Sequence, residues 1–273
     1  MTWTTLRVIP GRGRDAVVTA LFDAGAMAVQ EDGGAVITSF PSDIDVSAVC
    51  AAVKAADPTA MVATTALPDI DWSEAWRERL TSHAVGGLTI TPPWLAAGLD
   101  PARTVVIDPG MAFGTGDHPT TRGVLRLMPR FVRPGMRVAD LGAGSAALAI
   151  AAVKHGAARA AAIEIDHDAI ENAEENVVAN GVADRVQVIE GDALALLPLV
   201  APVDLVLANI ISSALLPMLG AIAAVLPAGG VAILSGLLTE EQGRMRHAFA
   251  EGGWHEVADD EEGSWWSVAI QRP

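Results

Sequence analysis

The second half of the chain alternates between short apolar segments and amphipathic segments. The apolar segments predict strands at Arg137–Leu141, Ala160–Ile165, Val186–Glu190, Asp204–Ala208 and Gly230–Leu234. The amphipathic segments predict helices that begin at Ser145, Asp168, Ser213 and Thr239. Buried strands that alternate with helices are typical of a parallel sheet whose two faces are both covered by helices. We therefore predict an α/β unit built on such a sheet.

The last part of the chain departs from this alternation. Trp254–Ala258 and Ser264–Ile270 are predicted strands, and the acidic segment Asp259–Gly263 is predicted to be the loop between them. Strands joined by a short loop pair in an antiparallel hairpin. The sheet is thus expected to end in an antiparallel hairpin.

Residues 1–67 follow another pattern. Strands are predicted at Trp3–Ile9, Ala26–Gln30, Ala35–Phe40 and Thr59–Leu67, and helices at Asp15–Ala24 and Ile44–Ala56. The segment Asp32-Gly33-Gly34 is a hairpin signal between the second and third strands. The order strand, helix, strand, strand, helix, strand is the ferredoxin-like α+β pattern. We find no catalytic constellation in this unit and expect it to bind a partner.

The segment between these two units predicts a junction. Residues 68–81 are expected to form a linker and a short helix, Trp72–Leu80, with Asp71 as its N-cap. Short strands follow at Leu88–Ile90 and Thr104–Asp108, separated by a turn at Pro92–Trp94. The chain of 273 residues fits two unequal domains. We predict one domain at 1–67 and a larger one at 82–273.

Composition narrows the classes of partner. Lys and Arg number 18 against 33 Asp and Glu, so the formal net charge is −15. Such a surface argues against direct nucleic-acid binding and suits a basic protein, although solubility alone would also explain it. The single cysteine, Cys50, and the spacing of the six histidines offer no metal site. The N-terminus lacks a signal-peptide pattern, and we expect a cytoplasmic protein, acting as a monomer.

One long uncharged segment requires a membrane test. No charged residue occurs between Leu205 and Leu238, a length that could span a bilayer. It is interrupted by polar residues, prolines and glycines: Asn209, Ser212, Ser213, Pro217, Pro227, Gly229 and Gly230. We interpret it as a buried strand, a helix and a second buried strand, without membrane insertion.

The turn after the strand Arg137–Leu141 carries the first chemical signal. Its glycines, Gly142 and Gly144, allow a ligand to approach the backbone, and the following helix offers free N–H groups. Glu164 ends the next strand, where a carboxylate accepts hydrogen bonds from ribose hydroxyls. The pattern predicts nucleoside binding without choosing between NAD and S-adenosylmethionine. The late position of the turn in the chain and the final hairpin favour a methyltransferase.

The loop before that unit is the second signal. Phe113, in the glycine-rich segment 109–121, can form a wall against a ligand, and Thr115 follows it. Thr120 and Thr121 stand where a helix begins, so Thr121 has two possible roles, capping or a hydrogen bond to the cofactor. His118 is expected to hold the loop in shape rather than to act as a base.

Two strand ends add further candidates. Asn209 ends an otherwise apolar strand, where ligands of open α/β sheets lie. A buried amide there needs a partner, either the backbone or a ligand. Asp192 follows the third strand, and its carboxylate would either bond to an adenine amino group or lie in a solvated turn.

Residues 69–273 resemble the PrmA family, the ribosomal protein L11 methyltransferases. The resemblance rests on the helix from Asp71 to Trp76, the Pro92–Trp94 turn and the loop Phe113–Gly116 followed by His118–Thr121. It also rests on the glycine turn, on Ala208–Ile210 and on Leu234–Gly236, whereas residues 1–67 match in pattern only. The resemblance implies a Class I, Rossmann-like methyltransferase sheet that uses S-adenosyl-L-methionine.

The resemblance also implies a substrate and site roles. The substrate would be the basic ribosomal protein L11, methylated at lysine side chains and at the N-terminal amine, with residues 1–67 recognising it. The cofactor contacts would be Thr121, Gly142, Gly144, Glu164, Asp192 and Asn209. Asn209, Phe113 and Thr115 would face the methyl transfer. Three residues depart from the family pattern: Ala143 replaces Cys, Ala146 replaces Gly and Glu164 replaces Asp.

Methyl transfer requires a neutral amine, and only roughly 0.04% of a free lysine is neutral at pH 7. A dry channel beside a positive charge favours that form, so we expect no dedicated base, with Asn209 orienting the amine. Other classes stay open. Three are enzymes: a lysine methyltransferase acting on another basic protein, a glutamine methyltransferase and an NAD-dependent oxidoreductase. The fourth is a non-catalytic nucleoside-binding module in which Ala146 prevents the pocket from binding the cofactor.

Overall fold

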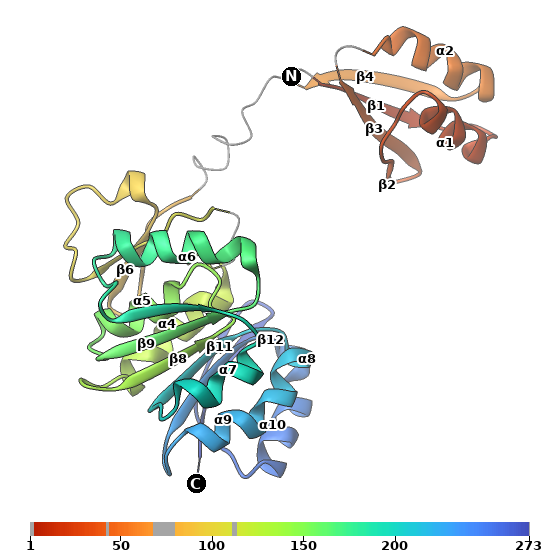
Figure 1. The fold of residues 1–273 in the computed structure, drawn as a ribbon. Helices are drawn as coiled ribbons and strands as arrows, with labels where there is room; N and C mark the ends of the chain where they lie inside the picture. Colours follow the sequence, from red (N-terminus) through yellow and green to blue (C-terminus); the bar gives the residue numbers. More distant parts are fainter. Residues whose placement is uncertain (1–2, 42–43, 68–79, 111–113, 273) are drawn as a thin grey trace. The chain divides into compact units, whose positions relative to one another are not determined.

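The computed structural model describes residues 3–41, 44–67, 80–110 and 114–272 (Figure 1). The chain divides into two compact units, residues 1–79 and residues 80–273. Each unit has its own core, and each is described by itself below. The predicted helix Trp72–Leu80 lies, except for Leu80, outside the described residues.

The first unit has the predicted order of elements: β1 (Trp3–Ile9), α1 (Arg14–Asp23), β2 (Gln30–Asp32), β3 (Ala35–Pro41), α2 (Val46–Ala56) and β4 (Met61–Leu67). Its antiparallel sheet has the order β2-β3-β1-β4. Both helices pack on this sheet through a core that includes Leu6, Leu21 and Phe40. The unit therefore has the ferredoxin-like pattern.

The predicted strand Ala26–Gln30 is wrong in its bounds. Only Gln30–Asp32 pairs with β3, and the carbonyl of Ala28 instead accepts a hydrogen bond from the Thr38 hydroxyl at 2.7 Å. The two glycines of the hairpin turn, Gly33 and Gly34, both have positive φ, as this tight turn requires.

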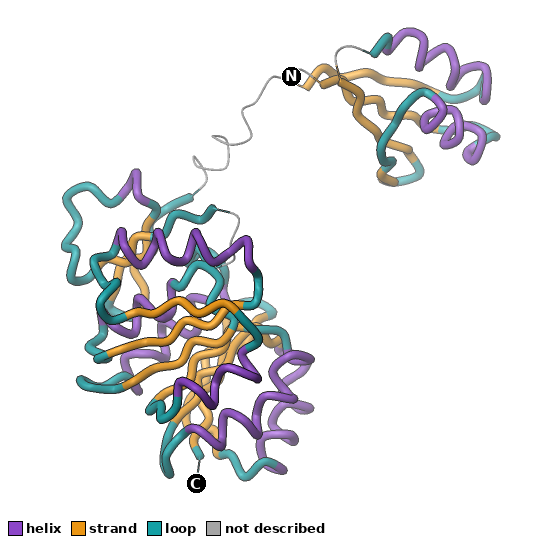
Figure 2. The backbone as a smooth tube through the Cα atoms, viewed as in Figure 1, coloured by secondary structure: helices purple, strands orange, loops and turns teal. Residues whose placement is uncertain are grey.

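The second unit begins with a small sheet of β5 (His83–Val85), β6 (Leu88–Thr91) and β7 (Thr104–Val106). The strands of the main sheet are drawn in orange in Figure 2. Their order in this sheet is β10-β9-β8-β11-β12-β14-β13. Its strands are β8 (Arg137–Leu141), β9 (Arg159–Glu164), β10 (Val186–Glu190), β11 (Leu205–Asn209), β12 (Val231–Leu238), β13 (His255–Glu262) and β14 (Trp265–Gln271). The first five are parallel, and the last two form the antiparallel hairpin. The predicted Class I sheet is confirmed.

Helices cover both faces of this sheet, as predicted. One apolar cluster packs α4 (Pro119–Phe131), α5 (Ala147–Lys154) and α6 (His167–Ala179) against one face. A second cluster packs α7 (Ala193–Val200), α8 (Ser212–Leu215), α9 (Leu219–Val225) and α10 (Gln242–Glu251) against the other. Short 3₁₀ helices occur at Pro93–Leu95, Leu216–Met218 and Thr239–Glu241. The long uncharged segment is indeed strand, helix and strand.

The acidic segment Asp259–Gly263 was wrongly predicted as a loop, because all of it except Gly263 lies in β13. Positive partners stabilise its carboxylates: Arg126 of α4 pairs with Asp260 at 2.6 Å, and Arg246 of α10 lies 3.6 Å from Asp259. The helix α7 and the strand β5 were not anticipated.

Candidate active site

A cavity of about 460 Å³ lies at the carboxyl ends of β8, β9, β11 and β12. Its wall combines residues of the predicted loop, the glycine turn and three strand ends: Gly114, His118, Thr120, Thr121, Gly142, Ala143, Gly144, Ala147, Leu148, Glu164, Ile165, Asn209, Ile210, Ile211, Gly236 and Trp265. A larger open groove of about 700 Å³ at the amino ends of the strands contains none of the predicted site residues. Five of the predicted site residues, Thr121, Gly142, Gly144, Glu164 and Asn209, therefore converge on the smaller cavity.

The glycine turn needs its glycines for two reasons. Gly142 and Gly144 adopt φ of 68° and 50°, a region that favours glycine. A Cβ atom on Gly142 would also lie 2.6 Å from Cγ2 of Ile210. The turn thus brings bare backbone to the cavity wall.

Ala146 has a left-handed backbone, with φ of 63°, and is the sole non-glycine residue with positive φ in the described part of the chain. Its side chain is fully buried in the core between α5 and the sheet, and it does not line the cavity. The left-handed backbone would favour glycine, which is the residue that the resemblance implied at this position. The suggestion that the Ala146 methyl group crowds the cofactor finds no support in the geometry.

Glu164 binds the turn directly. Its Oε2 accepts the N–H of Gly144 at 2.8 Å, and its Oε1 accepts the N–H groups of Ile165 and Asp166 at 2.8 and 2.9 Å. A carboxylate offers about four acceptor positions, so one or more are left for a ligand hydroxyl. Glu164 both shapes the turn and lines the cavity.

Asn209 extends from the end of β11 to α4. Its Nδ2 donates to Oγ1 of Thr121 at 3.3 Å, while its Oδ1 is buried without a hydrogen-bond partner among the described residues. The alternative of a buried asparagine bonded to the backbone is therefore not what the structure shows. Thr121 is almost fully buried and lines the cavity, and the capping role belongs to His118, whose side chain accepts the N–H of Thr120.

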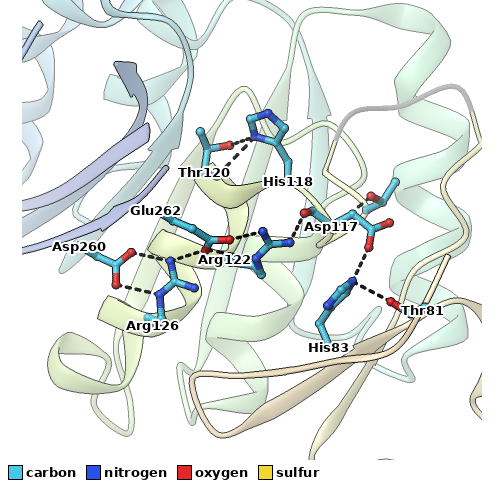
Figure 3. Close-up of polar contacts among 10 residues, drawn as sticks. Thr81, His83, Asp117, His118, Thr120, Arg122, Arg126, Asp260 and Glu262 are labelled. Carbon is cyan, nitrogen blue, oxygen red and sulfur yellow. Dashed lines mark hydrogen bonds and ion pairs between the residues drawn. The ribbon is translucent and has the colours of Figure 1, made fainter. Parts of the chain in front are cut away.

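A polar network fixes the end of the loop that leads into α4 (Figure 3). Asp117 contacts His83 of β5 through its carboxylate and accepts a hydrogen bond from Arg122 at its carbonyl. The hydroxyl of Thr115 accepts the N–H of Asp117 at 3.4 Å and does not line the cavity. The network therefore fixes the backbone beside the cavity wall. Phe113 lies outside the described residues.

The same network continues to β13. Arg122 pairs with Glu262, and Arg126 bridges Glu262 at 2.8 Å and Asp260 at 2.6 Å. The hydrogen bond from Arg122, with further contributions from Arg126, lowers the pKa of Glu262 to about 2. Burial, together with the charge of Arg122, lowers the pKa of His118. A neutral His118 ring at neutral pH suits its position edge-on to Trp265, 4.9 Å between centroids.

A second cavity of about 280 Å³ adjoins the first and shares Gly142, Ile165 and Ile210 with it. Asp192 lines this cavity, and its carboxylate caps α7 by accepting the N–H of Leu194 at 2.9 Å. The two cavities together form an elongated, mostly apolar site with room for a nucleoside and an attached chain.

Comparison with known proteins gives a consistent result. Residues 15–273 match the family of ribosomal protein L11 methyltransferases (PrmA). The chain belongs to this family. It is 36% identical to the ribosomal protein L11 methyltransferase of Thermus thermophilus over 259 residues, covering 94% of this chain and 95% of that protein.

Two further relatives support the assignment. The ribosomal protein L11 methyltransferase of Geobacter sulfurreducens is 43% identical over 203 residues, which are 74% of this chain and 66% of that protein. The crystal structure of a ribosomal protein L11 methylase from Lactobacillus delbrueckii subsp. bulgaricus superimposes with a TM-score of 0.61 at 32% identity, covering 68% of this chain and 95% of that one.

In this member of the PrmA family, sequence reasoning missed a row of asparagines. Asn172, Asn176 and Asn180 are spaced by four along α6 and bond to the segment from Val106 to Asp108. Asparagine is a poor helix former, and three on one helix face would have been the signal. The sequence analysis also gave Trp265 no role, although it lines the cavity.

The described residues contain no cluster of side chains suited to a metal ion. Within the same described part, none of the helices has the length and apolar character needed to cross a membrane.

Proposed function

We propose that this chain transfers the methyl group of S-adenosyl-L-methionine to amine nitrogens of ribosomal protein L11, at lysine side chains and the N-terminus. Membership of the PrmA family supports this assignment. The observation that carries it is the buried Oδ1 of Asn209, an acceptor without a partner among the described residues, at a cavity whose wall includes the glycine turn and Glu164.

The residues present fit the cofactor. Gly142 and Gly144 offer backbone without side chains, and Glu164 has acceptor capacity left for ribose hydroxyls. Asp192 stands at the second cavity, suited to an adenine amino group, and Thr121 lines the first. When bound, S-adenosylmethionine supplies an electrophilic methyl group on a positively charged sulfur.

The chain's own task is to present a neutral amine. Removing the proton from a free lysine at pH 7 costs about 4–5 kcal/mol, and an apolar site lowers this cost by disfavouring the charged form. The cavity wall is largely apolar, with Ala147, Leu148 and Ile210 in it. The Asn209 oxygen would accept an N–H of the amine and orient its lone pair, so that positioning replaces a dedicated base.

The first test measures cofactor and substrate separately. Calorimetric titration with S-adenosylmethionine, with NAD as the control, should give micromolar binding of the former alone. Mass spectrometry should then find methyl groups on purified L11 and none on an unrelated basic protein. Binding without methylation of L11 would favour another substrate, and absence of binding to either cofactor would favour a non-catalytic module.

Asn209 is tested by truncation. Asn209→Ala should lower kcat by about 10²-fold, the order expected when an orienting contact is lost, and should change the affinity for S-adenosylhomocysteine less. Asn180→Ala, which removes an amide of the same kind away from the cavity, is the control. Unchanged turnover of Asn209→Ala would exclude the orienting role.

The domain roles and the setting are part of the same proposal. We infer that residues 1–67 recognise the substrate and that residues 82–273 carry the transfer, joined by residues 68–81. We also expect a monomer, a cytoplasmic location and no direct contact with nucleic acid. Light scattering of the purified chain tests the first of these expectations.

A further inference from the structure

The helix α6 contacts both the glycine turn and the preceding loop through buried side chains. Asn176 is only 2% exposed. Its Oδ1 accepts the N–H of Asp108 at 2.8 Å, and its Nδ2 donates to the carbonyls of Asp108 and Ser145, both at 3.2 Å. One amide therefore joins three segments: α6, the end of the β7 segment and the turn at the amino end of α5.

Ser145 extends this connection to the far end of the loop. Its hydroxyl donates to the carbonyl of Gly114 at 3.0 Å. A Cβ atom on Gly114 would lie 2.9 Å from that hydroxyl, which shows how closely the Ser145 side chain approaches the backbone of Gly114. The loop is thus attached on both sides of residues 109–113, at Asp108 by Asn176 and at Gly114 by Ser145.

The entry of the loop also lies tightly on α6. The Nδ2 of Asn172 donates to the carbonyl of Asp108 at 3.1 Å, and a Cβ atom on Gly110 would lie 2.6 Å from that nitrogen. Neither Asn172 nor Asn176 lines the cavity, whereas Gly114 and Gly144 do. The asparagines can therefore act on a ligand only through the segments that they hold.

We propose that Asn176 is a positioning residue: it fixes the loop and the glycine turn at the mutual distance that the cofactor and the methyl acceptor require. The proposal rests on the proposed function, because it assigns the held segments to cofactor binding. No other side chain in the described part of the chain bonds directly to both Asp108 and Ser145. Both ends of the amide are required, because its oxygen accepts the N–H of Asp108 and its nitrogen donates to the carbonyls of Asp108 and Ser145.

Asn180, the C-cap residue directly after α6, provides a matched control. Its Oδ1 accepts the N–H of Val106 at 2.9 Å, and its Nδ2 donates to the Val106 carbonyl at 2.6 Å. Asn180 thus makes the same pair of backbone bonds two residues earlier on the same segment. Its Nδ2 also donates to the backbone carbonyl of Asn176 at 2.8 Å, whereas the Nδ2 of Asn176 donates to Ser145 in the glycine turn.

The experiment compares Asn176→Ala with Asn180→Ala in the full chain. Calorimetry measures the Kd for S-adenosylhomocysteine well below the unfolding temperature, and steady-state kinetics with L11 separates kcat from KM. We expect Asn176→Ala to weaken cofactor binding about tenfold and to lower kcat further. We expect Asn180→Ala to change both less than twofold, while the two variants lose similar thermal stability.

Two more variants guard against misfolding. Asn176→Asp keeps the acceptor for the Asp108 N–H but points a carboxylate at two carbonyls, so it should bind the cofactor as poorly as Asn176→Ala. Combining Asn176→Ala with Ser145→Ala should weaken binding by less than the product of the single effects, because both side chains act through Ser145.

The outcomes distinguish the two proposals. Equal Kd values for the Asn176 and Asn180 variants and the wild-type chain would overturn the positioning role and leave the proposed function intact. Failure of the wild-type chain to bind S-adenosylhomocysteine would overturn the proposed function, and the positioning role with it. If both Asn176→Ala and Asn180→Ala lost cofactor affinity in proportion to their loss of thermal stability, the role of Asn176 would be purely structural.

Discussion

The carboxyl group of Asp140 is fully buried at the end of β8, just before the glycine turn. Its Oδ2 accepts the N–H of Ala149 at 2.9 Å, while its Oδ1 has no partner among the described residues. Burial, opposed by the bond from Ala149 and reinforced by the charge of Glu164, raises the pKa of Asp140 from 3.8 to about 7. The folded protein therefore holds a proton that the unfolded chain releases.

The sign of the effect on stability follows from this difference. As pH rises from 3.8 toward 7, the unfolded chain loses the Asp140 proton and the folded protein keeps it, so the free energy of unfolding falls. Well above pH 7 both states are ionised and the loss is complete. A pKa difference of about 3 units corresponds to about 4 kcal/mol, a large fraction of the stability of an ordinary domain.

Asp140→Asn removes the titration and keeps an acceptor for the Ala149 N–H. We expect the free energy of unfolding of the variant, minus that of the wild-type chain, to rise by about 1.4 kcal/mol per pH unit between pH 4.5 and 6.5. Above pH 7 the difference should level off. The new amide group can also change the free energy of unfolding by a constant amount at every pH. Such a change does not affect the test, because the test measures how the difference between variant and wild type varies with pH.

The assay is urea unfolding of the cofactor-free chain, followed by tryptophan fluorescence from about pH 4.5 to pH 8.5. Asp184→Asn is the control, since it makes the same chemical change on a side chain that is 79% exposed. A difference between variant and wild type that stays flat across this range would refute the reasoning, and so would a slope of opposite sign.

Three further predictions concern the site. Ala146→Gly relieves about 1–2 kcal/mol of left-handed strain but loses a buried methyl group worth about 0.8 kcal/mol and adds unfolded-state entropy. Its stability in urea should therefore change by less than about 1 kcal/mol, and calorimetry should give an unchanged cofactor Kd; a tenfold tighter Kd would show that the methyl group obstructs the cofactor. Glu164→Gln removes the acceptor either for the N–H of Gly144 or for the N–H groups of Ile165 and Asp166. The affinity for S-adenosylhomocysteine should therefore fall at least about tenfold. An unchanged Kd in calorimetry would contradict this expectation. The net charge of −15 should make association with L11 several-fold slower in stopped-flow experiments when salt rises from about 50 to about 500 mM; a rate independent of salt would exclude electrostatic steering.

Local sequence signals were sufficient to predict most strands of the main sheet. The strands Arg137–Leu141 and Val186–Glu190 have the predicted bounds, because short apolar runs there are bounded by charged residues and turns. The convergence of Gly142, Glu164 and Asn209 on one cavity was also predictable, since the carboxyl ends of parallel strands meet at one edge.

Other features depended on partners distant in the sequence. The acidic strand β13 looks like a loop because its neutralising arginines, Arg122 and Arg126, lie 140 and 134 residues before their partners Glu262 and Asp260. The helix α7 has an apolar sequence with Pro198 inside it, so it lacks the polar face by which a surface helix is recognised. The three-residue strand β5 is too short to show any periodicity.

Most polar side chains around the cavity form hydrogen bonds with backbone groups, and these bonds affect which form of an amine the cavity can hold. Glu164 binds the N–H of Gly144, Asn176 binds the Ser145 carbonyl, and Arg122 binds the carbonyl of Asp117. Such contacts fix the wall. Glu164 contributes a carboxylate to that wall, but its oxygens already accept backbone N–H groups, so under the proposed function an amine would meet mostly apolar surface. The buried Asn209 oxygen lacks a partner among the described residues. An uncharged acceptor in a rigid apolar wall holds a neutral amine better than an ammonium group, because an ammonium group needs several acceptors or a counter-charge to replace its hydration. Under the proposed function, we therefore expect this arrangement to favour the protonation state that methyl transfer requires, and we expect no dedicated general base.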